Sequence, residues 1–157
     1  MYANETKLQP ILEGTKQYVV PLFQRPYSWN KDQWSRLWDD LIDLSEETNP
    51  RTHFMGSIVT MPTTSVPEGV TKYLLIDGQQ RLTTIFILLS LLRDSALGKN
   101  EKNKNKLAEE IQNTLLVNQY KEETDYFKLL PTQVDRDFFE RLVKERTFDR
   151  QNQIITT

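Results

Sequence analysis

Two short segments of this 157-residue chain gather side chains that bind anions. In residues 76–84, an apolar run ends at Asp77 and Gly78, and the polar side chains that follow at once are Gln79, Gln80 and Arg81. A glycine permits a tight turn, and a helix that begins directly after it presents free backbone N–H groups to a phosphate. The guanidinium and the two amides would converge on that anion, while Asp77 would hold Mg²⁺ or orient an attacking water. These residue types predict a phosphate site at the end of a buried strand.

The same segment has a plainer interpretation, which the residues alone leave open. It contains neither the GxxxxGK[ST] nor the GxGxxG pattern of known phosphate-binding loops. A strand–glycine–helix turn is common, and in such a turn the segment would only cap the helix, with its amides and guanidinium in solvent.

The second segment, residues 21–29, combines an amide, a guanidinium and two aromatic rings just before a predicted helix. Arg25 offers a bidentate fork for phosphate and Gln24 adds a neutral donor and acceptor. Tyr27 and Trp29 could stack on a nucleic-acid base. The alternative is a loop whose aromatic rings fill the edge of the core and whose arginine forms a surface ion pair.

A third candidate segment is residues 53–57. Gly56 lies inside an apparent strand, where a glycine often marks a bulge or a close approach to the backbone. Gly56 and Ser57 therefore either face a ligand or serve packing. His53 is an acid–base candidate or an ordinary surface residue, and without an identifiable partner in the sequence it supports no hydrolytic triad.

Composition bounds the classes of protein that remain. With 38% apolar and 27% charged residues, the chain is typical of one globular domain. A net charge of -2 excludes a simple polycationic nucleic-acid binder, though not a local basic groove. The lack of cysteine excludes disulfides and thiolate chemistry and favours a cytoplasmic location, and a single histidine excludes a His-rich metal site. No signal peptide is expected, and the longest apolar run, 85–92, is too short to cross a membrane.

Hydrophobic periodicity predicts an α+β fold, a small mixed sheet packed against helices. Strands are expected at residues 18–23, 54–61, 70–76 and 126–130, with the second and third antiparallel, and helices at residues 31–47, 79–97, 107–118 and 133–146. Asn30 and Gln33 have the spacing of a capping box, and Gly98 is the expected stop of the second helix. That helix is apolar on most sides and should be the central, buried one.

Three further features receive structural interpretations. The stripe that includes Trp34 and Trp38 is predicted to be core or a domain interface. The acidic cluster of Asp39, Asp40 and Asp43 is predicted to be a solvated helix face, and the lysine-rich run 99–106 a mobile loop.

Taken together, the blocks VPLFQRPYSW (20–29), HFMGSIV (53–59) and IDGQQRLTT (76–84) resemble one family. They are similar to the N-terminal domain of GmrSD-type, modification-dependent restriction endonucleases, whose fold is related to ParB and sulfiredoxin. The resemblance covers roughly residues 18–95, with DGQQR at 77–81 as its most specific motif. It implies a ParB/sulfiredoxin-like nucleotide-binding core at residues 1–98. Residues 99–157 are then a helical extension of the same domain.

The family resemblance implies nucleoside-triphosphate binding and hydrolysis in a system that restricts phage DNA. Family members usually continue into an HNH-type nuclease domain, a motif that this chain lacks, so the nuclease is expected on a separate region or subunit. The leading hypothesis is an NTP-binding, Mg²⁺-dependent phosphohydrolase that regulates restriction. The runner-up is a non-catalytic module that senses DNA modification, and a protein-interaction domain is the third alternative.

Each expected site residue has a role in this hypothesis. The catalytic set is Asp77, Gln79, Gln80 and Arg81, with Asp77 also the expected Mg²⁺ ligand. The expected phosphate ligands are Gln24, Arg25, Gly56, Ser57, Gly78, Arg81 and Thr84. Tyr27 and Trp29 are expected to contact a base or a modification. If the two strands that precede these motifs end at one sheet edge, Arg25 and Arg81 should share a cleft, with Asp77 at its rim and Gly56–Ser57 as its floor.

Overall fold

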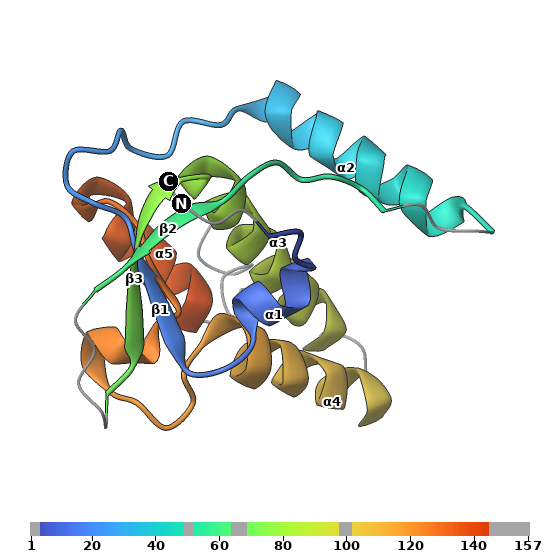
Figure 1. The fold of residues 1–157 in the computed structure, drawn as a ribbon. Helices are drawn as coiled ribbons and strands as arrows, with labels where there is room; N and C mark the ends of the chain where they lie inside the picture. The colour runs from blue at the N-terminus through green and yellow to red at the C-terminus, as the bar shows by residue number, and fades with distance from the viewer. Residues whose placement is uncertain (1–3, 49–51, 64–68, 98–101, 145–157) are drawn as a thin grey trace, which may run out of the picture.

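Four strands form one mixed sheet in the computed structural model, which describes residues 4–48, 52–63, 69–97 and 102–144 (Figure 1). They are β1 (Lys16–Val19), β2 (Val59–Pro62), β3 (Thr71–Asp77) and β4 (Leu129–Leu130), arranged in the order β2-β3-β1-β4. β1 pairs in parallel with both β3 and β4, whereas β2 pairs antiparallel with β3. The predicted α+β class and the antiparallel pair are therefore confirmed.

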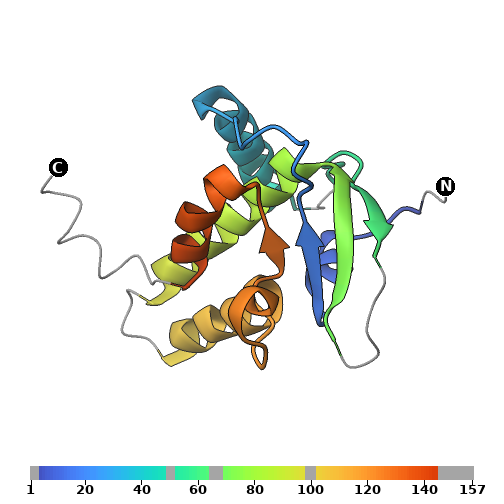
Figure 2. The ribbon, with the colours of Figure 1, turned by 90° about the vertical axis from the view of Figure 1, so that its left-hand side faces the viewer.

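Helices pack against one side of this sheet, as Figure 2 shows for α3, α4 and α5. The helical elements of the described residues are α1 (Leu8–Leu12), α2 (Lys31–Glu46), α3 (Gln79–Leu97), α4 (Lys102–Glu110), the π-helix η1 (Ile111–Leu116), the 3-10 helix η2 (Glu123–Tyr126) and α5 (Gln133–Lys144). No helix in the described residues is long and apolar enough to cross a membrane.

α3 is the central helix, as its apolar pattern predicts. Leu82 and Phe86 of α3 are fully buried, as is Leu75 on the neighbouring strand β3. The ring of Phe86 lies 6.0 Å from that of Phe139 on α5, so sheet, α3 and α5 share one core. Burial of large apolar side chains is the main stabilising contribution to such a core.

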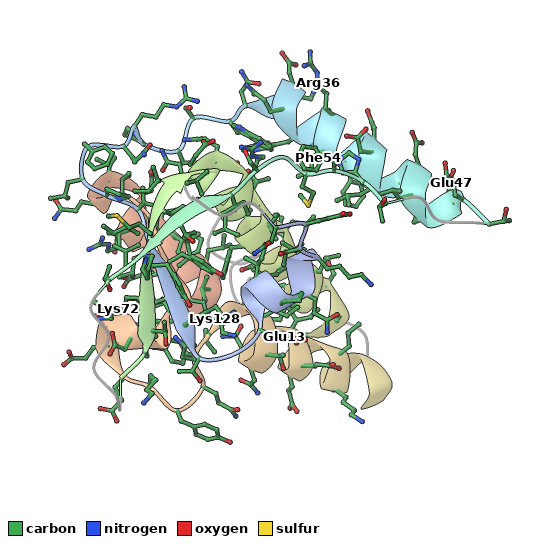
Figure 3. The ribbon with its side chains drawn as sticks, in the orientation of Figure 1. Glu13, Arg36, Glu47, Phe54, Lys72 and Lys128 are labelled. Carbon is green, nitrogen blue, oxygen red and sulfur yellow. The ribbon has the colours of Figure 1, made fainter. Side chains whose placement is uncertain are left out.

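The C-terminal region completes this core through two buried cations. Arg93 of α3 is 2% exposed and donates to the carbonyl oxygens of Leu142 and Val143, at 3.0 and 2.6 Å, which end α5. Lys128, 3% exposed, donates from Nζ to the carbonyls of Leu12 and Thr114 and so ties α1 to η1 (Figure 3). Both cations satisfy carbonyl groups that helix ends leave without partners.

Several predicted element boundaries were wrong, and strand pairing explains two of them. β1 ends at Val19. The N–H of Val20 still donates a hydrogen bond to the carbonyl of Leu130, but Pro21 has no N–H to donate, so the pairing stops there. β2 begins only at Val59, since its partner β3 ends at Asp77, opposite Val59, and leaves residues 54–58 no strand to pair with.

The predicted starts of two further elements, α4 and β4, were also wrong, and two predicted features lie outside the described residues. The lysine-rich run is helical from Lys102 onward, where α4 packs Ala108 into the protein. The expected strand at 126–130 shortens to β4 because η2 occupies residues up to Tyr126. Residues 64–68 of the expected connection between β2 and β3, and the predicted stop at Gly98, lie outside the described residues.

α2 forms as predicted but projects from the rest of the fold (Figure 1). Asn30 caps it with a full capping box: its Oδ1 accepts from the N–H of Asp32, and its own N–H donates to Gln33 Oε1. None of the 16 residues of α2, all of which the structure describes, is buried. Trp34 and Trp38 are 47% and 50% exposed, so the core interpretation of their stripe is wrong.

Candidate functional site

The two motif-bearing segments leave the sheet at the same edge. β1 and β3 are parallel neighbours, with Val19 opposite Leu74, so the β1–α2 loop (residues 20–30) and the Asp77–Gly78 turn begin side by side. This is the arrangement that the sequence predicts for a shared site. Gln24 on the loop donates from Nε2 to the carbonyl of Ile76 at 2.8 Å and joins the two segments directly.

The side-chain amides of Gln79 and Gln80 hold the β1–α2 loop in place, and we call this pair the amide clamp. Gln79 donates from Nε2 to the carbonyl of Arg25 at 2.8 Å. Gln80 donates to the carbonyl of Pro26 at 3.1 Å and accepts from the N–H of Ser28 at 2.8 Å. Both glutamines are less than 10% exposed. A buried amide that satisfies backbone groups fixes the loop that carries them.

Tyr27 connects the loop to three helices. Its hydroxyl lies 2.7 Å from Thr84 Oγ1 on α3 and accepts from Trp34 Nε1 on α2 at 2.7 Å. Its backbone N–H donates to Asp135 on α5, also at 2.7 Å. The ring predicted to contact a base thus has its polar tip committed to the protein.

Gly78 makes the sharp turn into α3. Its φ of +93° is a left-handed conformation, and a Cβ there would lie 3.0 Å from the carbonyl oxygen of Ser57. Asp77 is exposed, and one of its carboxylate oxygens accepts from the N–H of Gly78 at 2.7 Å. Among the described residues, the N–H groups of residues 79–81 have no hydrogen-bond acceptor, as is usual for the first turn of a helix.

The guanidinium of Arg81 is laid across Gly56. Arg81 Nη2 donates to the carbonyl of Ser57 at 3.0 Å, and a Cβ at Gly56 would lie 1.8 Å from Arg81 Nη1. Gly56 also has a φ of +95°, which favours glycine. The close approach that the sequence suggests at Gly56 is thus made by Arg81, whose side chain is only half-buried.

Beside Arg81 lies a pocket of about 230 Å³ between α2 and residues 53–55. Besides Arg81, its walls include Trp29, Gln33, Leu37, Asp40, His53 and Met55. Arg36 also lines it, and its side chain extends away from the body of the protein (Figure 3). Arg25, which the sequence places in a cleft with Arg81, is exposed and does not line this pocket.

The contribution of α2 to the pocket is absent from the predicted site. Gln33, Leu37 and Asp40 lie on one face of the helix, because residues spaced by three and four share a face. The spacing of these three residues is the one signal in the sequence that could have indicated the pocket face of α2. The large side chains of the stripe that includes Trp34 and Trp38 dominate the helical pattern instead. His53, which has no evident partner in the sequence, lies 3.5 Å from Asp40, measured from Nε2 to Oδ2.

Comparison with known protein families matches residues 8–157 to the family described as GmrSD restriction endonuclease, N-terminal domain. The chain belongs to this family. The match extends well past the motif-bearing residues and takes in β4 and α5, which complete the core. None of the curated proteins compared with the chain matches its sequence.

Membership of the GmrSD N-terminal family gives the domain a role in a DNA restriction system. The family resemblance expected from DGQQR and FQRPYSW is thereby confirmed. The geometry shows how the two motifs interact: the glutamines of DGQQR, the amide clamp, bind the backbone of FQRPYSW.

A metal ion held by protein side chains alone has no evident site here. The described residues contain no group of three or more acidic or histidine side chains that could hold one. Mg²⁺ often needs only one or two carboxylates, with phosphate oxygens and waters completing its shell. The exposed carboxylate of Asp77 fits that requirement, since its second oxygen accepts no hydrogen bond from the described residues.

Proposed function

We propose that this domain binds a nucleoside triphosphate with Mg²⁺ and hydrolyses it to regulate a restriction system. The observation that carries the proposal is the placement of Arg81, which lies in the first turn of α3 and whose guanidinium is held over Gly56. A fixed guanidinium next to a helix N-terminus favours a phosphate group.

Phosphoryl transfer needs mainly positioning and stabilisation of charge. In the proposed reaction a water oxygen bonds to the terminal phosphorus, the bond to the bridging oxygen breaks, and inorganic phosphate and a diphosphate leave. Arg81 and the first-turn N–H groups of α3 stabilise the phosphate oxygens. Arg25, exposed on the β1–α2 loop, supplies a second cation from the other motif.

Asp77 is the residue that would hold Mg²⁺, and the ion would neutralise charge on the phosphates. Asp77 is the last residue of β3, at the edge where both motifs leave the sheet. The two glutamines of the motif have a different role in the proposal. Because their amides bind the loop backbone, Gln79 and Gln80 are positioning residues that hold Arg25 and Trp29 beside α3.

The direct test is titration of the purified chain with each of the four NTPs and Mg²⁺, combined with measurement of phosphate release. Wild-type protein should bind at least one NTP and release phosphate from it. Arg81→Ala should abolish both without unfolding the protein, because its guanidinium is not part of the core. Arg141→Ala is the matched control, since it removes an exposed guanidinium from α5. Failure of folded wild-type protein to bind any NTP would refute the proposal.

A second candidate function is a DNA-modification sensor that works with a nuclease domain or subunit outside this chain. Trp29 at the wall of a partly apolar pocket favours this candidate, because such a pocket can take a modified base or backbone group. Binding to modified and unmodified DNA over a series of salt concentrations tests it. A negligible dependence on salt would count against phosphate contacts by Arg81 and Arg25.

A further inference from the structure

We infer that the pocket between α2 and residues 53–55 takes the nucleoside half of the nucleotide, and that Trp29 and Asp40 bind it. This inference rests on the proposed function and adds the place and the residues of nucleoside recognition. The pocket adjoins Arg81, so a nucleotide whose phosphates lie at the start of α3 can extend its sugar and base into it.

The chemistry of the walls selects an uncharged ligand. Trp29, Leu37 and Met55 supply apolar surface, and the indole offers a face on which a base can stack. Asp40 places a carboxylate in the same pocket, and a carboxylate repels phosphate while it accepts hydrogen bonds from N–H and O–H donors. Bases and sugars present such donors and phosphates do not. The phosphates therefore stay on the side of Arg81.

The size of the pocket agrees with a partial ligand. Its volume of about 230 Å³ is below the roughly 300–1,000 Å³ of sites that enclose a whole drug-sized molecule. One half of a nucleotide would lie inside and the other half at the rim, where Arg81 and α3 begin.

The contact between His53 and Asp40 prepares the carboxylate for this task. His53 Nε2 lies 3.5 Å from Asp40 Oδ2, which leaves Oδ1 without a partner among the described residues. His53 thereby lies against one oxygen of the carboxylate, and the other is available to a donor of the ligand. Asp40 is a binding residue in this inference, and His53 is a positioning residue.

The test compares two probes, an NTP and inorganic tripolyphosphate, both with Mg²⁺, by calorimetric titration. Trp29→Ala and Asp40→Ala should each weaken NTP binding about tenfold, the size of one lost stacking or charged hydrogen-bond contact. Neither should weaken tripolyphosphate binding, which needs only the phosphate side. Arg81→Ala should weaken both. Matched controls outside the pocket are Trp38→Ala and Asp43→Ala on α2, which should change neither.

The outcomes separate this inference from the proposed function. If Arg81→Ala abolishes NTP binding while Trp29→Ala and Asp40→Ala bind NTP as wild type does, the nucleoside lies elsewhere and the inference is wrong. If wild-type protein binds neither probe, both proposals fail. Asp40 is exposed on a projecting helix, so its variant keeps the test decisive should Trp29→Ala fail to fold.

Discussion

α2 and α3 are helices of similar length that the fold places differently. α3 buries eleven of its residues and forms the centre of the core, and its polar first turn holds the β1–α2 loop. α2 buries none, yet it carries a complete capping box and a row of large apolar side chains. Both line the same pocket, α3 through Arg81 and α2 through Leu37 and Asp40.

The difference shows that a helical pattern of apolar residues specifies a helix but not what covers it. α3 is buried because it follows β3 through a tight turn and must pack back onto the sheet. α2 follows an eleven-residue loop whose position is fixed by hydrogen bonds to the start of α3, which leaves the helix beyond the sheet edge. In the proposed function the rigid helix binds phosphate and the projecting helix completes the pocket.

The largest expected contrast is in global stability. Phe86→Ala in α3 should cost about 3–5 kcal/mol, because it opens a cavity at a fully buried site. Trp38→Ala in α2 removes a half-exposed ring and should change the free energy of unfolding by about 0.5 kcal/mol or less. Urea denaturation of both variants checks the pair. Equal losses would show that α2 belongs to the core in solution.

A buried cation on the core side gives a pH-dependent contrast. Burial, together with the charge of Lys16, lowers the pKa of Lys128 to about 8, against 10.5 for an ordinary lysine. The unfolded chain therefore binds more protons than the folded one between these values, so stability rises with pH across this window. From pH 8 to pH 10 the gain from Lys128 should approach about 2 kcal/mol, at 1.4 kcal/mol per pKa unit.

The variant Lys128→Met should lose this rise, as measured by urea denaturation at pH 8 and pH 10. Burial also raises the pKa of Tyr18, to about 12, so its own effect lowers stability as the pH rises and lies mainly above pH 10. A rise of the same size in Lys128→Met would assign the effect to another group.

The amide clamp should contribute to the stability of the protein and hold the loop that leads from β1 into α2. Gln80→Leu leaves the carbonyl of Pro26 and the N–H of Ser28 without their partner and should cost about 1–3 kcal/mol. Amide exchange should rise in the β1–α2 loop and the start of α2, while the core of α3 stays protected. Unchanged exchange in the loop would contradict the clamp.

Much of this arrangement follows from the sequence, and the reasons for the rest are physical. The Asn30 capping box and the buried α3 were predictable because both depend on local spacing. The shared edge of β1 and β3 followed only from an assumption about the sheet, which the parallel pairing bears out. The exposure of α2 was not predictable, since it depends on where a loop is anchored by residues about fifty positions away.

The candidate site shows the same division. The types of the motif residues identify them in the sequence. That both glutamine amides bind the backbone of the β1–α2 loop depends on the fold, which brings the two segments together. Arg81 lies over Gly56, part of the predicted floor of the cleft, because a residue without a Cβ leaves room for the guanidinium. The sequence predicts Asp40 on a solvated face, and it is exposed, but only the fold brings it to His53 and the pocket.

The smallest expected effect is local to α2. Asn30→Ala removes the cap and should destabilise α2 by about 1 kcal/mol. Because α2 lies outside the core, the midpoint of thermal unfolding should hardly move, while amide exchange in residues 31–40 should accelerate. A clear drop of the midpoint would mean that α2 unfolds together with the core.

The most direct test of the account is amide hydrogen exchange with and without a saturating non-hydrolysable NTP analogue and Mg²⁺. A single site formed by both motifs and α2 predicts added protection in three separate segments together: residues 27–40, 53–57 and 78–82. The helices α4 and α5 should serve as unaffected internal references. Saturated binding that leaves these three segments unprotected, or that protects only a surface elsewhere, would contradict the account.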